Sequence, residues 1–389
     1  MIELLNPEIQ KFINDHLNDQ HVELMLKASQ FPDWPMKAIV EQIAAKKKAQ
    51  GKLPLWFSIE GVIWPPAISM EQCSSELTAR YKASLVSGKS MVDLTGGLGV
   101  DTYFLSSNFD EATYVEIKEE LHSLASHNLK VLSSDIQTVN ESAENYLNQM
   151  SAVDLIYIDP ARRDNDSRKV VFLEDYSPNV VGMLHGLRNK AKQILIKVSP
   201  MLDIKKAIFD LGSVSEVHVV AVKNEVKELL FLVDTEVQRE PKIIAVNLGS
   251  NDRSFSFQFT QEEEAHTEFA DVMDYLFEPN AAILKAGAFK SIGLEYGLKK
   301  LHNNSHLYTS QTLIDNFPGR AFRVQTELSL NKKKIRQQLS SDKANITVRN
   351  YPMSVKEIRN KTGLKEGGEQ YIFATTDQSG KKVVLCEKV

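Results

Sequence analysis

The chain has 389 residues, of which 42% are hydrophobic and 25% charged, so it is long enough for two or three domains with buried cores. No stretch approaches the roughly 18 consecutive apolar residues of a membrane helix, and the first residues lack a basic segment followed by an apolar run. We therefore expect a cytoplasmic protein with no membrane partner. The two cysteines, Cys73 and Cys386, are too few for a disulfide framework or a cysteine-built zinc site, and we expect no metal.

The net charge of −5 is unevenly distributed along the chain. Residues 318–389 contain 15 Lys and Arg against 7 Asp and Glu, which leaves a net charge of −13 for residues 1–317. A basic C-terminal module on an acidic body favours a polyanionic partner for that module. On charge alone, a basic face that is merely solvated explains the pattern equally well.

The first part of the chain has apolar residues at helical spacing. Residues 1–50 are expected to form helices with a break at Pro32–Pro35, and residues 55–66 an extended segment. One further helix is expected next, because its apolar residues fall on one helical face: Met70, Cys73, Leu77, Tyr81 and Leu85. We assign residues 1–88 to a mainly helical N-terminal segment.

From Met91 onward, short apolar strands alternate with helices. The expected strands are Val92–Thr95, Thr113–Ile117, Lys130–Ser133, Leu155–Asp159, Ile194–Val198, Glu216–Val222 and Leu229–Val233. Such alternation predicts an α/β fold with a doubly wound, mostly parallel sheet. The last two strands are separated by too few residues for a crossover, so the final strand must be antiparallel. This seven-strand, Rossmann-like pattern resembles the class I S-adenosylmethionine-dependent methyltransferases.

The stretch Met91–Asp101 is the centre of the predicted site. Asp93 lies at the carboxyl end of the first expected strand, and a turn with little side-chain bulk follows it before the next helix. Backbone N–H groups in such a turn can approach a ligand closely. The candidate cofactor-binding residues of this stretch are Asp93, Thr95, Gly96, Gly97 and Gly99.

Acidic residues also follow the next two expected strands. Glu116 comes 23 positions after Asp93, near the ~20-residue interval at which an acid meets a ribose in nucleotide-binding α/β folds. Asp135 is expected to accept a hydrogen bond from an adenine amino group, with Ile117 and Ile136 beside the ring. Each acid alone fits a helix cap or a loop; three acids after three successive strands favour a nucleoside site.

A dinucleotide is the alternative ligand for this loop. The fingerprint G-x-G-x-x-G that starts at Gly97 and Gly99 would need a glycine at position 102, where the chain has Thr102. Asp93 would repel a pyrophosphate, whereas it suits the cationic amine of a methionine moiety. We therefore predict S-adenosylmethionine rather than NAD.

The fourth expected strand ends in Asp159-Pro160-Ala161-Arg162. This sequence partly resembles the Asp-Pro-Pro-Tyr signatures of nucleic-acid amino methyltransferases, in which the acid holds an exocyclic amine. Asp159, Pro160 and Arg162 are the candidate catalytic residues, and Arg162 fits base stacking, a phosphate contact or a loop salt bridge. Uridine C5 methyltransferases have a similar motif, but the fifth strand here is not followed by the cysteine nucleophile they need.

After the seven strands, an added hairpin is expected from Lys242–Asn247 and Ser254–Phe259. We therefore assign residues 89–270 to the sheet domain. The basic residues 318–389 are expected to form a small α+β module. Its predicted strands are Phe322–Glu327, Asn345–Val348, Gln370–Thr375 and Lys382–Cys386, with a helix that starts in Ser354–Lys361.

Several motifs together resemble a family of bacterial class I methyltransferases with a C-terminal THUMP-like domain. They are Glu71-Gln-Cys-Ser-Ser-Glu76, Asp93-Leu-Thr-Gly-Gly-Leu-Gly-Val-Asp-Thr102, Asp159-Pro-Ala-Arg-Arg-Asp164, Lys197-Val-Ser-Pro-Met-Leu-Asp203, Asn350-Tyr-Pro-Met-Ser354 and Tyr371-Ile-Phe-Ala-Thr375. The resemblance implies a small ferredoxin-like segment at residues 271–317, a THUMP-like domain at residues 318–389, and a role in RNA modification. With the motif at Asp159, it makes methylation of tRNA or rRNA at a base amine our leading hypothesis. Two alternatives stay open: a cofactor-sensing RNA-binding protein without catalysis, and a methyltransferase of a protein or small molecule.

Overall fold

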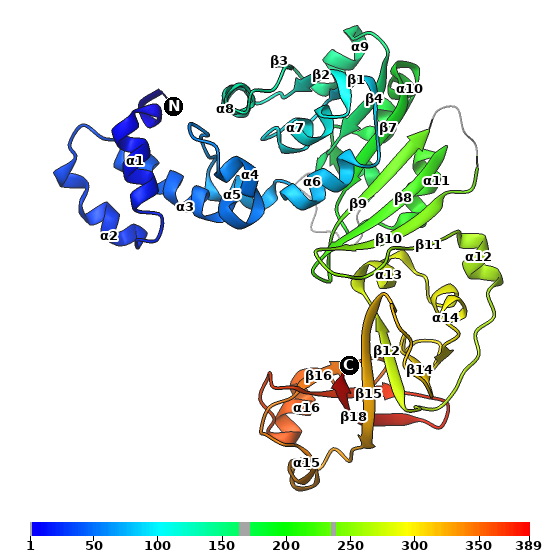
Figure 1. Ribbon diagram of the computed structural model, residues 1–389. Helices are drawn as coiled ribbons and strands as arrows, with labels where there is room; N and C mark the ends of the chain where they lie inside the picture. The colour runs from blue at the N-terminus through cyan, green and yellow to red at the C-terminus, as the bar shows by residue number, and fades with distance from the viewer. Residues whose placement is uncertain (1, 163–171, 235–238) are drawn as a thin grey trace. The chain divides into compact units, whose positions relative to one another are not determined.

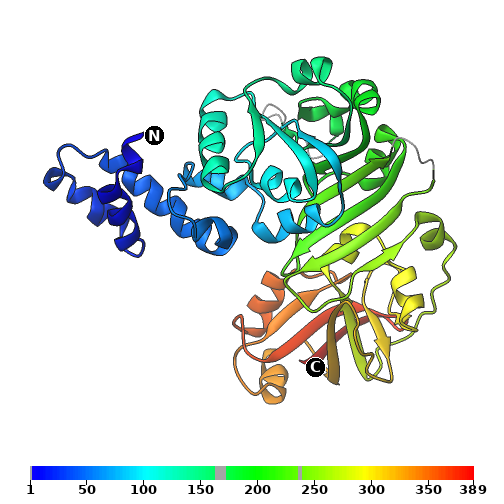
Figure 2. The ribbon, with the colours of Figure 1, turned by 45° about the horizontal axis from the view of Figure 1, so that its top comes forward.

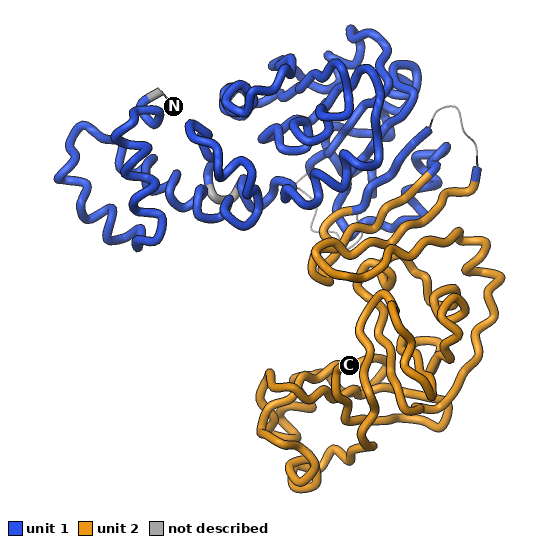
Figure 3. Tube along the Cα trace, viewed as in Figure 1, with its two compact units in different colours: residues 1–215, 229–239 blue, residues 216–228, 240–389 orange. Residues whose placement is uncertain are grey.

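The computed structural model describes residues 2–162, 172–234 and 239–389 (Figure 1). The chain forms two compact units, coloured separately in Figure 3. Unit 1 comprises Met1–Ser215 and Leu229–Arg239, and unit 2 comprises Glu216–Glu228 and Glu240–Val389. None of the helices in the described residues is long and apolar enough to span a membrane.

Unit 1 begins with a series of helices, as the apolar spacing predicts. Their bounds are α1 (Pro7–Asp15), α2 (His21–Leu26), α3 (Met36–Lys52), α4 (Pro54–Phe57), α5 (Ala67–Gln72) and α6 (Glu76–Ala83), with 3-10 turns η1 (Ile2–Leu5) and η2 (Ala28–Gln30). Ile13, Leu24 and Ile39 lie in the small apolar core that joins the first three helices.

The single helix expected over Met70–Leu85 is wrong, because the chain leaves the helix after Gln72 and starts a new one at Glu76. The Ser75 hydroxyl caps the new helix by accepting a hydrogen bond from the Thr78 N–H at 3.2 Å. Serine is favoured at this position because it pairs one of the unsatisfied N–H groups of the first turn. The expected extended segment at residues 55–66 also differs, since α4 covers its first residues.

The larger sheet has nine strands in the order β11-β10-β8-β9-β7-β4-β1-β2-β3 (Figure 1, Figure 2). Their bounds are β1 (Gly88–Asp93), β2 (Phe109–Val115), β3 (Ile136–Val139), β4 (Val153–Ile158), β7 (Ala191–Val198), β8 (Val214–Val222), β9 (Glu225–Asp234), β10 (Lys242–Leu248) and β11 (Phe255–Phe257). The reversed final strand of the predicted seven is confirmed, because β9 is antiparallel to β7. The expected hairpin extends the sheet, with β10 parallel to β8 and β11 antiparallel to β10.

Helices connect the parallel strands of this sheet: α7 (Val100–Ser106), α8 (Glu119–Val131), α9 (Ala143–Gln149), α10 (Val180–Lys190) and α11 (Ile204–Leu211). The central strands β4 and β7 contain mostly apolar runs, and residues 155–158 and 194–198 are all buried, with Lys197 as the one charged residue among them. Continuous burial of this kind is typical of a parallel sheet covered on both sides. Short pieces follow β4, namely β5 (Ala161–Arg162), η3 (Leu173–Asp175) and β6 (Tyr176–Ser177).

The third strand lies later in the chain than predicted. Lys130 and Val131 belong to α8, and Ser133 has a left-handed φ of 55°, so the residues expected to form the strand end a helix instead. The real strand β3 begins at Ile136, and it pairs in parallel with β2.

Unit 2 contains a seven-stranded sheet in the order β13-β14-β12-β15-β18-β17-β16. Its strands are β12 (Tyr275–Pro279), β13 (Lys299–Lys300), β14 (Tyr308–Ser310), β15 (Gly319–Glu327), β16 (Asn345–Val348), β17 (Gln370–Thr376) and β18 (Lys381–Lys388). Its helices are α12 (Phe259–Glu264), α13 (Ala281–Ala286), α14 (Ser291–Glu295), α15 (Lys332–Gln338) and α16 (Val355–Thr362). The four strands predicted between residues 322 and 386 are confirmed as β15 to β18.

Candidate functional site

A glycine turn joins β1 to α7, and its shape depends on the absence of side chains. Gly97 and Gly99 adopt left-handed φ angles of 54° and 77°. A Cβ atom on Gly96 would lie 2.1 Å from the Tyr114 ring, so the turn can pack against β2 only with glycine at this position. A Cβ on Gly97 would meet only the Thr95 carbonyl oxygen, at 3.8 Å, so there is open space beside the Gly97 Cα, although its carbonyl oxygen accepts from the Tyr114 hydroxyl at 2.6 Å.

Asp93 ends β1 beneath this turn, and its side chain is almost completely buried, with 1% of the residue exposed. Its carboxylate accepts hydrogen bonds from the Thr95 N–H at 2.9 Å and from the Thr102 hydroxyl at 2.6 Å. Burial raises the pKa of Asp93 to about 7, although both hydrogen bonds lower it. In the sequence, Thr102 only argues against a dinucleotide. In the structure, its hydroxyl fixes the Asp93 carboxylate beside the glycine turn.

Glu116 lies at the carboxyl end of β2 and contacts the same turn. One of its carboxylate oxygens accepts from the Gly97 N–H at 3.0 Å, and the other accepts from the Lys118 N–H at 2.8 Å. The next residue, Ile117, is 66% exposed, which is unusual for a large apolar side chain next to a buried acid. The structure thus brings Glu116 to the glycine turn, whereas the contact of Ile117 with an adenine ring stays a prediction.

The predicted positions of Asp135 and Ile136 are wrong. Because β3 starts at Ile136, Asp135 precedes the strand and lies at the amino edge of the sheet, opposite to the glycine turn. Ile136 packs instead beside Tyr114 and Leu129. The carboxyl end of β3 is followed by Asn140, whose side-chain amide donates to the Glu116 carbonyl oxygen at 2.7 Å.

Asp159 follows β4 and is joined directly to the glycine turn. Its backbone N–H donates to the Thr95 hydroxyl at 2.6 Å, and its carboxylate lies 2.5 Å from the Lys197 ammonium. Pro160 is buried, and the exposed Arg162 lies in β5, opposite Tyr176 of β6. Arg163 and Asp164, the rest of the motif, lie outside the described residues.

Comparisons with known proteins agree with this geometry. Residues 275–318 match the ferredoxin-like domain family, and residues 319–388 match the THUMP domain-like family. Two proteins from strains of Mycobacterium tuberculosis, named as S-adenosylmethionine-dependent methyltransferases and otherwise uncharacterized, are 24% identical over 336 residues, which is 84% of this chain and 89% of theirs. A candidate methyltransferase of Porphyromonas gingivalis W83, known from a crystal structure, is 33% identical over 98% of both chains, with a TM-score of 0.88.

The chain belongs to this family of S-adenosylmethionine-dependent methyltransferases. The class I fold predicted from the strand pattern is thereby confirmed, and so is the THUMP-like family of the C-terminal residues.

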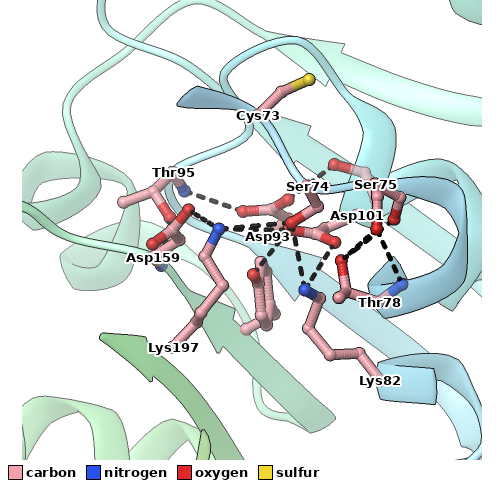
Figure 4. Close-up of polar contacts among 12 residues, drawn as sticks. Cys73, Ser74, Ser75, Thr78, Lys82, Asp93, Thr95, Asp101, Asp159 and Lys197 are labelled. Atoms are coloured by element: carbon pink, nitrogen blue, oxygen red, sulfur yellow. Dashed lines mark hydrogen bonds and ion pairs between the residues drawn. The ribbon is translucent and has the colours of Figure 1, made fainter. Parts of the chain in front are cut away.

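This methyltransferase also has a buried charged cluster beside the glycine turn, which sequence analysis missed. Lys82 of α6 and Asp101 of α7 form an ion pair of 3.1 Å, in which the lysine is fully buried. The other Asp101 oxygen accepts from the hydroxyls of Ser74 and Tyr157, each at 2.7 Å. In Figure 4, Lys82 and Lys197 direct their amino groups toward Asp101 from two different elements. The serine pair before α6 marks a helix start in the sequence, but it does not indicate the ion pair.

No histidines, cysteines and acids in residues 2–162, 172–234 and 239–389 of the methyltransferase form a group of three or more that could hold a metal ion.

Proposed function

We propose that this methyltransferase acts on RNA, either tRNA or rRNA, and transfers the methyl group to an exocyclic amine of a base. The observation that carries the proposal is the hydrogen bond from the Asp159 N–H to the Thr95 hydroxyl. It joins the end of β4, which carries the acceptor carboxylate for a target amine, to the turn that would hold the cofactor. Substrate and cofactor groups would then meet at one edge of the sheet.

The residues of the turn fit S-adenosylmethionine. The open space beside the Gly97 Cα lets a ligand approach the turn, and Asp93 offers a carboxylate for the methionine amine. Glu116 retains acceptor capacity for the ribose hydroxyls, because each carboxylate oxygen has two lone-pair sites and only one N–H is bound to each. The exposed Ile117 provides an apolar contact for the adenine. The cofactor supplies a methyl group on an activated sulfonium.

The protein then has mainly to position the target. A neutral amine needs no proton removed before it attacks, so in-line placement is the main contribution of the side chains. Asp159 would accept a hydrogen bond from the amine, and Pro160 would stiffen the turn that presents this acid. Arg162 is exposed and would contact the base face or a phosphate of the RNA.

The THUMP-like residues supply the proposed RNA-binding surface. In α15, Ile335 is buried and anchors the helix, whereas Lys332, Lys333 and Lys334 are exposed. Exposed lysines attract phosphates and make the affinity dependent on salt.

Replacing Glu116 by glutamine is expected to weaken binding of S-adenosylhomocysteine by about 10- to 100-fold, because a charge-assisted acceptor for the ribose is lost. Isothermal calorimetry measures this change. Glu111→Gln is the matched control, since Glu111 is exposed on the same strand and lies away from the turn. Equal affinities of the two variants would contradict the proposed role of Glu116, and absence of binding to the unaltered protein would contradict the cofactor site.

RNA from a strain that lacks this protein is expected to accept labelled methyl groups from S-adenosylmethionine. Changing Lys332, Lys333 and Lys334 to glutamine should weaken RNA binding and reduce the slope of log affinity against log salt by about 2–3. The control changes three exposed lysines of unit 1, Lys27, Lys37 and Lys47, and should leave the slope unchanged. Label that enters protein instead of RNA would favour the alternative substrate class.

A further inference from the structure

Two lysine–aspartate pairs join β4 to β7, one at each end of the strands. Lys192 lies 2.7 Å from Asp154 at the amino ends, and Lys197 lies 2.5 Å from Asp159 at the carboxyl ends. The first lysine side chain is 68% exposed, whereas the second is 11% exposed. Only the second pair borders the glycine turn, through the bond between Asp159 and Thr95.

Lys197 is held by more than Asp159. Its ammonium lies 3.3 Å from the Ser74 hydroxyl and 3.7 Å from the Asp101 carboxylate. Asp101 is in turn paired with the buried Lys82. Two lysines and two carboxylates therefore balance one another within a single cluster (Figure 4).

This balance changes what Asp159 can do. Its side chain is 35% exposed, so it can reach a ligand, but an ammonium 2.5 Å away already compensates its charge. A compensated carboxylate still accepts hydrogen bonds from N–H groups. It is a poor counter-ion for a cation, because the adjacent ammonium repels any second positive charge.

The other ionisable groups that face Asp159 do not alter this conclusion. They are Asp101 and Lys82, which pair with each other, the buried Asp93, and Tyr176 of β6. Burial raises the pKa of Tyr176, which keeps this phenol neutral.

We infer that Lys197 is a positioning and specificity-determining residue: it aims Asp159 and compensates its charge, so that the site takes a neutral nucleophile and disfavours a protonated amine. The inference rests on the proposed function and deepens it, because nucleobase amines are neutral at physiological pH whereas lysine side chains are protonated. It also names Ser74 as a group that fixes Lys197 from the segment before α6.

The test compares methyl transfer to RNA, taken from a strain that lacks this protein, for three variants. Lys197→Met is expected to lower kcat/KM by about 100-fold, because Asp159 loses its fixed direction. Its acid limb in the pH–rate profile should move up by about 1–3 pH units, because removal of a nearby opposite charge raises the pKa of a carboxyl. Lys197→Arg should return the acid limb to its position in the unaltered protein. Lys192→Met is the matched control, because it removes the lysine of the other pair, and it should behave as the unaltered protein.

The outcomes separate this inference from the proposed function. If the unaltered protein methylates RNA and Lys197→Met keeps its rate and its pH profile, the role of Lys197 is overturned. If the unaltered protein binds S-adenosylhomocysteine but methylates no RNA, the proposed function fails. In that case the Lys197–Asp159 ion pair is tested through protein stability. Lys197→Met should add a pH dependence to the melting temperature, and adding Asp159→Asn to this variant should remove it. Absence of that coupling would overturn the inference as well.

Discussion

Replacing Lys82 by methionine is expected to lower the free energy of unfolding by about 3–5 kcal/mol, because it leaves the buried Asp101 carboxylate without its nearest cation. Methionine nearly preserves the length of the side chain, so the loss reports the charge rather than a cavity. Lys197 lies 3.7 Å from Asp101 but is 2.5 Å from Asp159, so it is shared between two carboxylates and cannot fully replace the lost ion pair. Urea denaturation followed by circular dichroism measures the change.

The control for this variant is Arg80→Met in the same helix. The Arg80 side chain is 54% exposed, pairs with Glu76 and lies over the Phe104 ring, so its loss should cost only about 1 kcal/mol. The double variant Lys82→Met with Asp101→Leu should recover part of the lost stability, because it removes both buried charges. If Lys82→Met and Arg80→Met are equally stable, the buried ion pair contributes nothing.

The strand pattern of the sequence is sufficient to predict the sheet, because apolar runs in β4 and β7 can be accommodated only between two layers of helices. The reversal of β9 follows from a chain-length constraint, and the structure confirms it. The error at Lys130–Ser133 has a local cause. Val131 and Leu132 continue the apolar spacing of α8, in which Leu129 is buried, so a short apolar run at the end of a helix looks like a strand.

The position of an acidic residue that follows a strand can be predicted only where the end of that strand is predicted correctly. Asp93, Glu116 and Asp159 reach the glycine turn because their strands are placed correctly, and Asp135 does not because its strand is not. The buried cluster could not be predicted, since the partners Ser74 and Lys197 are 123 residues apart and meet only through the order of the strands. Lys82 is fully buried, and no motif in the sequence marks it.

Stability should fall as the pH rises from about 4 to 7, by up to about 4 kcal/mol from Asp93 alone. In the unfolded chain this carboxyl ionises near its ordinary pKa of 3.8, but burial in the native state raises the pKa to about 7. Between these values the native protein holds a proton that the unfolded chain has lost, so unfolding becomes more favourable as protons are withdrawn. Asp93→Asn should lack this component, and urea titrations at pH 5 and pH 8 on both proteins measure it.

The same buried acid should make cofactor binding depend on pH in the opposite direction. A cationic amine beside Asp93 favours the carboxylate, so binding of S-adenosylhomocysteine below pH 7 must release a proton, and the affinity should rise up to tenfold per pH unit until Asp93 is ionised. Calorimetry in two buffers with different ionisation enthalpies detects the released proton. Asp93→Asn should bind more weakly at pH 8, with no proton release from this position, although it is the more stable protein there. A cost in stability that is recovered when the ligand binds identifies Asp93 as a cofactor residue, whereas equal affinity of both proteins at pH 8 would leave Asp93 with a purely structural role.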